Sequence, residues 1–164
     1  MLRKLTMMMT LPLVIGSAVA QTGTSLQLTG TYMLTSIYDE LSDGRKNDTW
    51  GSDPKGVAMF SPYGMFAVQI YEGERQKAPD KAARDPIGPL VAYYGTYHVD
   101  DGGKTVTYQI QQSSFPGWNG LERRINIEQP NADTLRMTAP VKGDPKLGDF
   151  TTHVEWRRVS GHDH

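Results

Sequence analysis

One arginine is the first candidate for chemistry, because it interrupts an otherwise apolar strand face. In residues 121–128 (LERRINIE) every second side chain is Leu121, Arg123, Ile125 or Ile127. A strand that alternates in this way points Arg123 to the same side as its apolar neighbours. A guanidinium keeps its proton, so there it must pair with an acid, stack on an aromatic ring or meet an anionic or carbonyl group of a ligand. Arg123 is therefore a candidate ligand-binding residue, with an internal ion pair or ring stack as the alternative.

Tyr108 is the second candidate, in residues 104–111, where it alternates on the apolar side with Val106 and Ile110. If this strand is a neighbour of the one that carries Arg123, both side chains face the same interior. An amphipathic ring suits a pocket wall, and it equally suits core packing with its hydroxyl bonded to the backbone. An arginine close to the hydroxyl would favour the phenolate and could make it a proton-transfer group.

Three further aromatic residues are candidate pocket walls. Trp118 lies in the tight connection 115–120 (FPGWNG), where an indole could cap a pocket or plug the closed end of a barrel. Tyr97 lies in a predicted strand, and Phe66 alternates with Val68 and Ile70 in another.

The four histidines do not form a metal-binding motif. His98 and His153 lie in separate predicted strands, and His162 and His164 belong to the last four residues. No metal and no cofactor is therefore predicted. His153 could serve as a general base near neutral pH, although its place on the polar side of the last strand favours exposure. The catalytic residues, if any, are not assigned, and no phosphate-binding loop or nucleophilic serine motif is present.

Composition excludes several classes of protein. The chain has 164 residues, no cysteine, 17 Lys and Arg against 18 Asp and Glu, and 38% hydrophobic residues. Disulfide and thiolate chemistry are excluded, and the near-neutral charge disfavours a nucleic-acid partner, which requires a basic surface. These values are typical of one soluble domain.

The N-terminus resembles an export signal. Arg3 and Lys4 precede an apolar run over 5–19 that ends in Ala18-Val19-Ala20, which predicts a secretory signal peptide over 1–20. The alternative, a membrane anchor, is disfavoured because a spanning helix needs roughly 20 apolar residues. We expect a secreted, periplasmic protein with no membrane insertion after cleavage, a flexible leader over 21–28, a domain over 29–159 and a disordered tail over 160–164.

The rest of the chain is divided into short segments that alternate with a period of two and are separated by glycine and proline. They predict eight strands, at residues 31–39, 56–61, 65–71, 93–99, 104–111, 121–128, 134–139 and 151–159. Six of these form three hairpins. Such a set fits a closed up-and-down barrel or a two-sheet sandwich, and periodicity does not distinguish them.

Six turn and strand motifs together resemble a known family. They are Gly30-Thr31-Tyr32, Pro54-Lys55-Gly56, Ser61-Pro62-Tyr63-Gly64, Tyr94-Gly95-Thr96-Tyr97, Phe115-Pro116-Gly117-Trp118 and Val154-Glu155-Trp156-Arg157. Their order and spacing over residues 29–159 resemble the bacterial and fungal lipocalin-like domain family. The resemblance implies an all-β, eight-stranded antiparallel barrel with a small-molecule pocket. Some lipocalin-like barrels act as cofactor-free cyclases or isomerases, although most members of the family have no established activity.

The resemblance also implies a contact between an aromatic ring and an arginine at the base of the barrel, and this chain departs from the family pattern in two places. Lipocalins close the bottom of the barrel with an aromatic ring stacked on a late arginine, a role that Tyr32 and Trp156 with Arg157 and Arg158 would fill. The family carries histidine in the fifth strand where this chain has Tyr108-Gln109, which puts imidazole chemistry there in doubt. The lid before the fourth strand is short, with at most two turns around 81–84.

The sequence therefore predicts non-covalent binding of a small hydrophobic or aromatic ligand, with Arg123 holding its polar end and Tyr108, Trp118, Tyr97 and Phe66 as walls. One alternative is a cofactor-independent isomerase, cyclase or lyase in which Arg123, Tyr108 or His153 moves a proton. Another is a structural envelope protein with a filled core.

Overall fold

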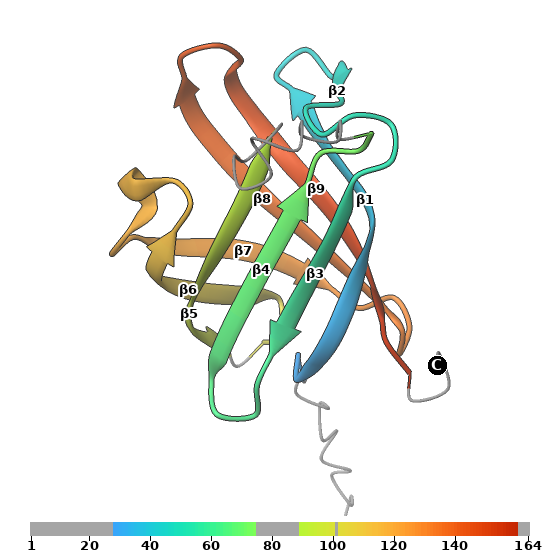
Figure 1. Ribbon diagram of the computed structural model, residues 1–164, viewed down its shortest axis with the longest axis vertical. Coiled ribbons are helices and arrows are strands. Elements are labelled where there is room, and N and C mark those ends of the chain that lie inside the picture. The colour runs from blue at the N-terminus through green and yellow to red at the C-terminus, as the bar shows by residue number, and fades with distance from the viewer. Residues whose placement is uncertain (1–27, 75–88, 101, 161–164) are drawn as a thin grey trace, which may run out of the picture.

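The alternating segments fold into one antiparallel sheet that closes on itself (Figure 1). The computed structural model describes residues 28–74, 89–100 and 102–160. Its strands are β1 (Gly30–Leu41), β2 (Lys46–Asn47), β3 (Lys55–Phe60), β4 (Met65–Tyr71), β5 (Leu90–Val99), β6 (Thr105–Ser113), β7 (Glu122–Glu128), β8 (Thr134–Asp144) and β9 (Gly148–Arg158), with a short 3-10 helix, η2 (Pro116–Trp118).

Pairing between the first and last long strands closes the barrel. The sheet order is β2-β1-β3-β4-β5-β6-β7-β8-β9, and β1 also pairs with β9, from Tyr32 opposite Arg158 to Leu41 opposite Phe150. Eight strands therefore form a closed up-and-down barrel, which confirms the predicted barrel and excludes the sandwich. The extra strand, β2, pairs with β1 at Asp39 and Glu40. Its polar residues do not alternate, which is why the sequence did not predict it.

The two ends of the barrel differ. Turns 61–64 and 129–133 lie at one end, with the start of β1, which is the lower end in Figure 1. Loop 48–54, the η2 connection and turn 145–147 lie at the other end, which we call the mouth.

Several predicted segments lie outside the described residues: the signal peptide, the leader up to residue 27, the short lid at 81–84 and the tail from residue 161. Leu28, which the sequence assigned to the leader, is instead part of the core at 2% exposed. In the part of the chain that the structure describes, no helix is long and apolar enough to cross a membrane.

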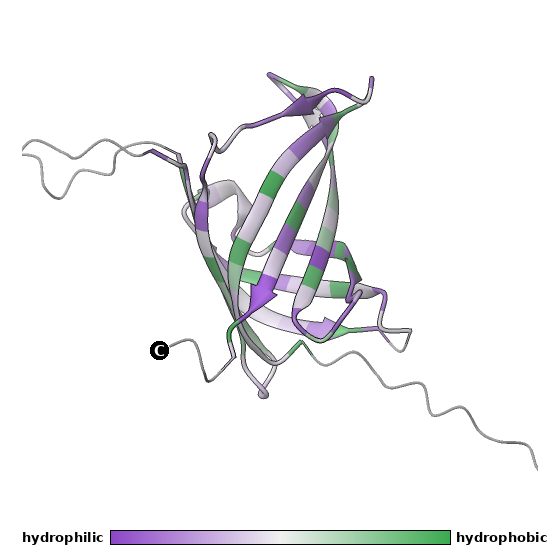
Figure 2. Cartoon of the chain, turned by 90° about the vertical axis from the view of Figure 1, so that its right-hand side faces the viewer, coloured by the Kyte–Doolittle hydropathy of each residue, from purple (hydrophilic) through white to green (hydrophobic). Residues whose placement is uncertain are grey.

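Aromatic rings fill the lower half of the barrel. Hydrophobic and hydrophilic residues alternate along the strands, so that one set faces inward (Figure 2). The Phe66 ring stacks on the Tyr108 ring with 4.1 Å between centroids. The Phe60 ring meets the Tyr97 ring edge-on at 5.2 Å and the Tyr32 ring at 5.9 Å. The lower half is therefore a solid core.

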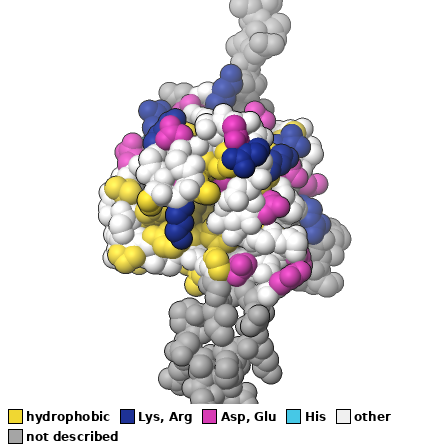
Figure 3. Space-filling model, turned by 90° about the horizontal axis from the view of Figure 1, so that it is seen from above, with side chains coloured by type: hydrophobic (Ala, Val, Ile, Leu, Met, Phe, Trp, Pro, Cys, Tyr) yellow, Lys and Arg dark blue, Asp and Glu magenta, His cyan; other side chains and the backbone are white. Residues whose placement is uncertain are grey.

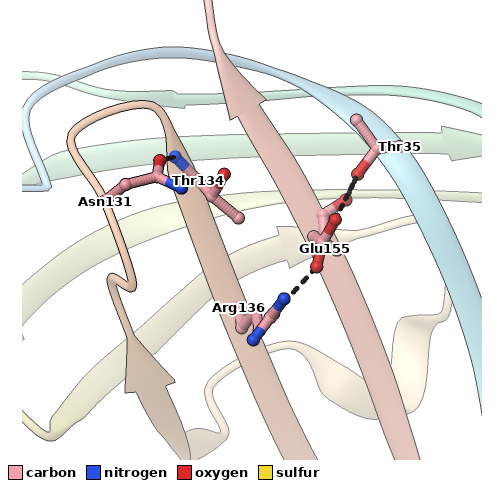
Figure 4. Close-up of polar contacts among 5 residues, drawn as sticks. All are labelled: Thr35, Asn131, Thr134, Arg136 and Glu155. Atoms are coloured by element: carbon pink, nitrogen blue, oxygen red, sulfur yellow. Dashed lines mark hydrogen bonds and ion pairs between the residues drawn. The ribbon is translucent and has the colours of Figure 1, made fainter.

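A β-bulge in β1 changes which residues face inward. Leu34 pairs with Trp156 and Ser36 with Glu155, so Thr35 is an extra residue in β1. The Thr35 hydroxyl donates to the Glu155 carbonyl oxygen at 2.9 Å, and Arg136 on β8 holds the Glu155 carboxylate at 2.8 Å (Figure 4). Below the bulge Tyr32 is buried, and above it the buried positions are Ile37 and Asp39. The inward face thus shifts by one residue along β1.

A glycine allows β5 and β6 to approach closely. Gly95 lies where the register between these strands shifts, and a Cβ atom there would lie 1.9 Å from the carbonyl oxygen of Gln109. No side chain fits at that distance, so Gly95 is required by the backbone packing.

The expected contact at the base is present between Tyr32 and Arg158. The Arg158 guanidinium lies over the Tyr32 ring, 4.7 Å from its centroid, and donates hydrogen bonds to the Tyr32 hydroxyl and, at 2.6 Å, to the Thr29 carbonyl oxygen. This contact joins the start of β1 to the end of β9. The neighbouring Arg157 points outward and is exposed.

We expect Arg158→Ala to lower the free energy of unfolding by about 2 to 4 kcal/mol, because charged hydrogen bonds and a cation–π contact are lost together. Arg157→Ala is the matched control and should change it by about 0.5 kcal/mol or less. Urea unfolding followed by tryptophan fluorescence measures both. Equal effects of the two substitutions would contradict a closing role for Arg158.

Candidate functional site

The upper half of the barrel contains a cavity of about 380 Å³ that opens at the mouth. Its walls are mainly aliphatic and aromatic, with a small number of polar groups. Seen from above, hydrophobic side chains gather on this face around a basic side chain (Figure 3). The volume lies in the range of pockets that bind small organic molecules.

Arg123 lines this cavity from β7. It is half-buried and pairs in register with Tyr108 on β6. The two strands are therefore neighbours, which is the condition under which both side chains face the same interior. The guanidinium carbon lies 4.4 Å from the centre of the Trp118 ring. None of the ion pairs among the described residues includes Arg123. The ring stack is thus present, and it orients a cation whose charge no described acid neutralises.

Trp118 covers Arg123 at the mouth. It ends η2, and its ring makes edge-on contacts with the Tyr93 ring at 5.6 Å and the Phe115 ring at 5.1 Å. The indole lies in the cavity wall at the open end. These contacts hold Trp118 as part of the rim, and the closed end of the barrel is filled by other rings.

Burial keeps the two cavity tyrosines protonated. It raises the pKa of Tyr108 well above its ordinary value, and the nearby Arg123 offsets this only in part. Burial also raises the pKa of Tyr93, again against a smaller opposing effect of Arg123. The Tyr108 hydroxyl donates a weak hydrogen bond to the Met137 sulfur at 3.7 Å. Arg123 thus favours the Tyr108 phenolate, as expected for a neighbouring cation, but desolvation outweighs this effect and favours the protonated hydroxyl.

The other predicted residues lie away from the cavity. Phe66 lies behind Tyr108 in the filled lower half, and Tyr97 donates from its hydroxyl to the Ser61 carbonyl oxygen at 3.0 Å near the base. Neither is in the cavity wall. They support the cavity floor from below instead of contacting its contents.

His153 points out of the barrel. It stacks on Tyr38 with 4.8 Å between ring centroids, and its Nε2 lies 3.3 Å from the Glu40 carboxylate. His153 and Tyr38 border a smaller hollow of about 210 Å³ on the outer surface. Among the residues that the structure describes, no three His, Asp or Glu side chains lie close enough to hold a metal ion. His153 thus has no route to a ligand inside the barrel.

Sequence reasoning missed a buried acid in the cavity wall. Asp39 on β1 is 3% exposed and accepts hydrogen bonds from the hydroxyls of Thr49, at 2.5 Å, and Thr152, at 2.7 Å. All three residues line the cavity. Strict alternation from Tyr32 would turn Asp39 outward, and only the bulge at Thr35 turns it in. Trp50 and Phe150 also line the cavity and were missed, since neither lies in a clearly alternating pattern.

Comparisons with known proteins give one family match that covers most of the chain. The family described as a lipocalin-like domain matches residues 29–159. No curated protein matches the chain. Among solved structures the chain is similar to a redesigned beta barrel, at 12% identity and a TM-score of 0.42 over 81% of this chain and 92% of that one. It is also similar to EF1p2_mFAP2b bound to DFHBI, at 15% identity and a TM-score of 0.43 over 80% and 94%.

We expect the stability of the barrel to fall as the pH rises above about 10, the ordinary pKa of tyrosine. Unfolding exposes Tyr93 and Tyr108, which then lose protons that the folded state retains, so the unfolded state is favoured at alkaline pH. Urea unfolding at about pH 8 and about pH 11 measures the loss, and Tyr108→Phe should reduce it. If the stability of Tyr108→Phe depended on pH in the same way as that of the wild-type protein, Tyr108 would not be a source of the alkaline destabilisation.

Proposed function

The chain belongs to the lipocalin-like domain family, and from that premise we propose that its barrel binds a small hydrophobic or aromatic molecule without forming a covalent bond to it. The observation that carries the proposal is the open cavity with Arg123 in an otherwise apolar part of its wall. Arg123 fixes a polar end of the ligand, an anionic or carbonyl group. Tyr108 and Trp118 contact its apolar body.

The free energies of the two kinds of contact explain why one guanidinium matters for ligand binding. A ring system that buries about 150 Å² of apolar surface gains about 4 kcal/mol, which by itself corresponds to roughly millimolar affinity. A hydrogen bond to a charged group adds about 1.5 to 3 kcal/mol, or roughly tenfold to a hundredfold. The apolar wall therefore supplies the attraction, and Arg123 determines the orientation and much of the selectivity.

Catalysis receives less support than binding. An isomerase, cyclase or lyase needs a group that gains or loses a proton near neutral pH. Burial raises the pKa values of Tyr93 and Tyr108 away from that range. His153 lies on the outer surface, and Arg123 keeps its proton. A structural protein with a filled core is also disfavoured, because the upper half of the barrel is hollow.

We also infer that the protein is exported and acts in the periplasm. The support is the pattern of Arg3 and Lys4, the apolar run over 5–19 and Ala18-Val19-Ala20. Mass spectrometry of the mature protein should then find an N-terminus at Gln21. An intact N-terminus in the exported fraction, or retention of the protein in the cytoplasm, would contradict this inference.

The binding proposal is tested with 6-methyl-2-naphthoic acid, an aromatic anion. We expect Arg123→Leu to weaken its binding by about tenfold or more, because the carboxylate loses its charged partner. Arg124→Leu is the matched control, since Arg124 is the next residue along β7, is exposed and should leave the affinity unchanged. Isothermal titration calorimetry measures both.

Two results would contradict the proposal. Equal affinities of the two arginine variants would remove Arg123 from the site, and chemical conversion of the probe during incubation would favour an enzyme. Native mass spectrometry of the protein purified from its producing cells should in addition show a retained small molecule, whose mass would identify the natural ligand class.

A further inference from the structure

The buried carboxylate of Asp39 has unused hydrogen-bonding capacity. Both of its oxygens face neutral hydroxyls, those of Thr49 and Thr152. No Lys, Arg or His among the described residues forms an ion pair with it. An ionised carboxylate offers about four acceptor sites, so about two stay open. A charge at 3% exposure with only neutral partners is incompletely compensated.

Asp39 and Arg123 lie on well-separated walls of the same cavity. Around the closed sheet, β1 and β7 are separated by β8 and β9 in one direction and by β3, β4, β5 and β6 in the other. Both side chains line the cavity, yet they do not form an ion pair with each other. A negative and a positive group therefore face a shared apolar space from nearly opposite sides.

This arrangement matches a ligand with two polar ends. A ligand with only an anionic group, bound at Arg123, leaves Asp39 without a cationic partner, and a ligand with only a cationic group, bound at Asp39, leaves Arg123 without an anionic one. A molecule that carries both groups, separated by an apolar body, compensates the buried charge of Asp39 and the half-buried charge of Arg123 at once.

Resting on the proposed function, we propose that the natural ligand is dipolar, with a protonated amine that binds Asp39, an aromatic or aliphatic body along the apolar wall, and an acidic group that binds Arg123. Thr49 and Thr152 hold the Asp39 carboxylate in position. Loop 48–54, which carries Thr49, thereby forms part of the amine subsite.

The test compares two probes that differ in one group, 6-(aminomethyl)-2-naphthoic acid and 6-methyl-2-naphthoic acid. We expect wild-type protein to bind the aminomethyl probe about tenfold more tightly, the gain typical of a charged hydrogen bond. Asp39→Asn should abolish this preference and leave the affinity for the methyl probe nearly unchanged. Calorimetric titration measures the affinities, and thermal unfolding checks that the variant is folded.

Asp144 is the matched control for Asp39, because it is the other acid of the cavity wall. It lies at the rim, where its carboxylate accepts hydrogen bonds from the backbone N–H groups of Lys146 and Leu147. Loss of the preference in Asp144→Asn but not in Asp39→Asn would overturn the inference. So would equal binding of both probes to wild-type protein, a result that needs no folded variant. If the methyl probe also fails to bind, the proposed function itself is wrong.

Discussion

The pairing of β1 with β9 is the constraint on which the rest of the structure depends. Alternating strands with one apolar face could equally stack as two sheets, and the hairpins alone do not exclude that arrangement. Once the first strand bonds to the last, every inward side chain faces the same axis, and no sheet edge is left along the closed ring. The Arg158 contact with Tyr32 stabilises this join at the base.

Closure by itself does not produce a cavity, because an eight-stranded barrel is narrow enough for side chains to fill. In this protein large rings occupy the lower half, where the ring centroids of Phe60, Phe66 and Tyr108 lie between 4.1 and 6.5 Å from one another. Smaller aliphatic residues such as Val68 and Val91 line the upper half, so the space between them stays open at the mouth. The position of the site thus follows from how side-chain volume is distributed along the axis.

The chemistry of the cavity depends on what surrounds each polar group. Desolvation keeps Tyr108 protonated even though it pairs in register with Arg123, so proximity of opposite charge is the weaker effect there. Arg123 stacks on a tryptophan ring, and Asp39 accepts hydrogen bonds from two neutral hydroxyls. Neither charge is neutralised by an oppositely charged side chain among the described residues. An apolar space bordered by two such groups favours recognition of a ligand over acid–base catalysis.

Period-two alternation and the turn residues in the sequence determined the eight barrel strands, three hairpins and the inward direction of Arg123 and Tyr108, because these depend only on local backbone geometry. The six motifs indicated the family. Only the tertiary structure decided that the sheet closes and which rings fill the barrel, since both depend on contacts between distant segments. It alone also placed Asp39 inside, because the bulge at Thr35 forms against Glu155 on a strand that lies at the other end of the chain.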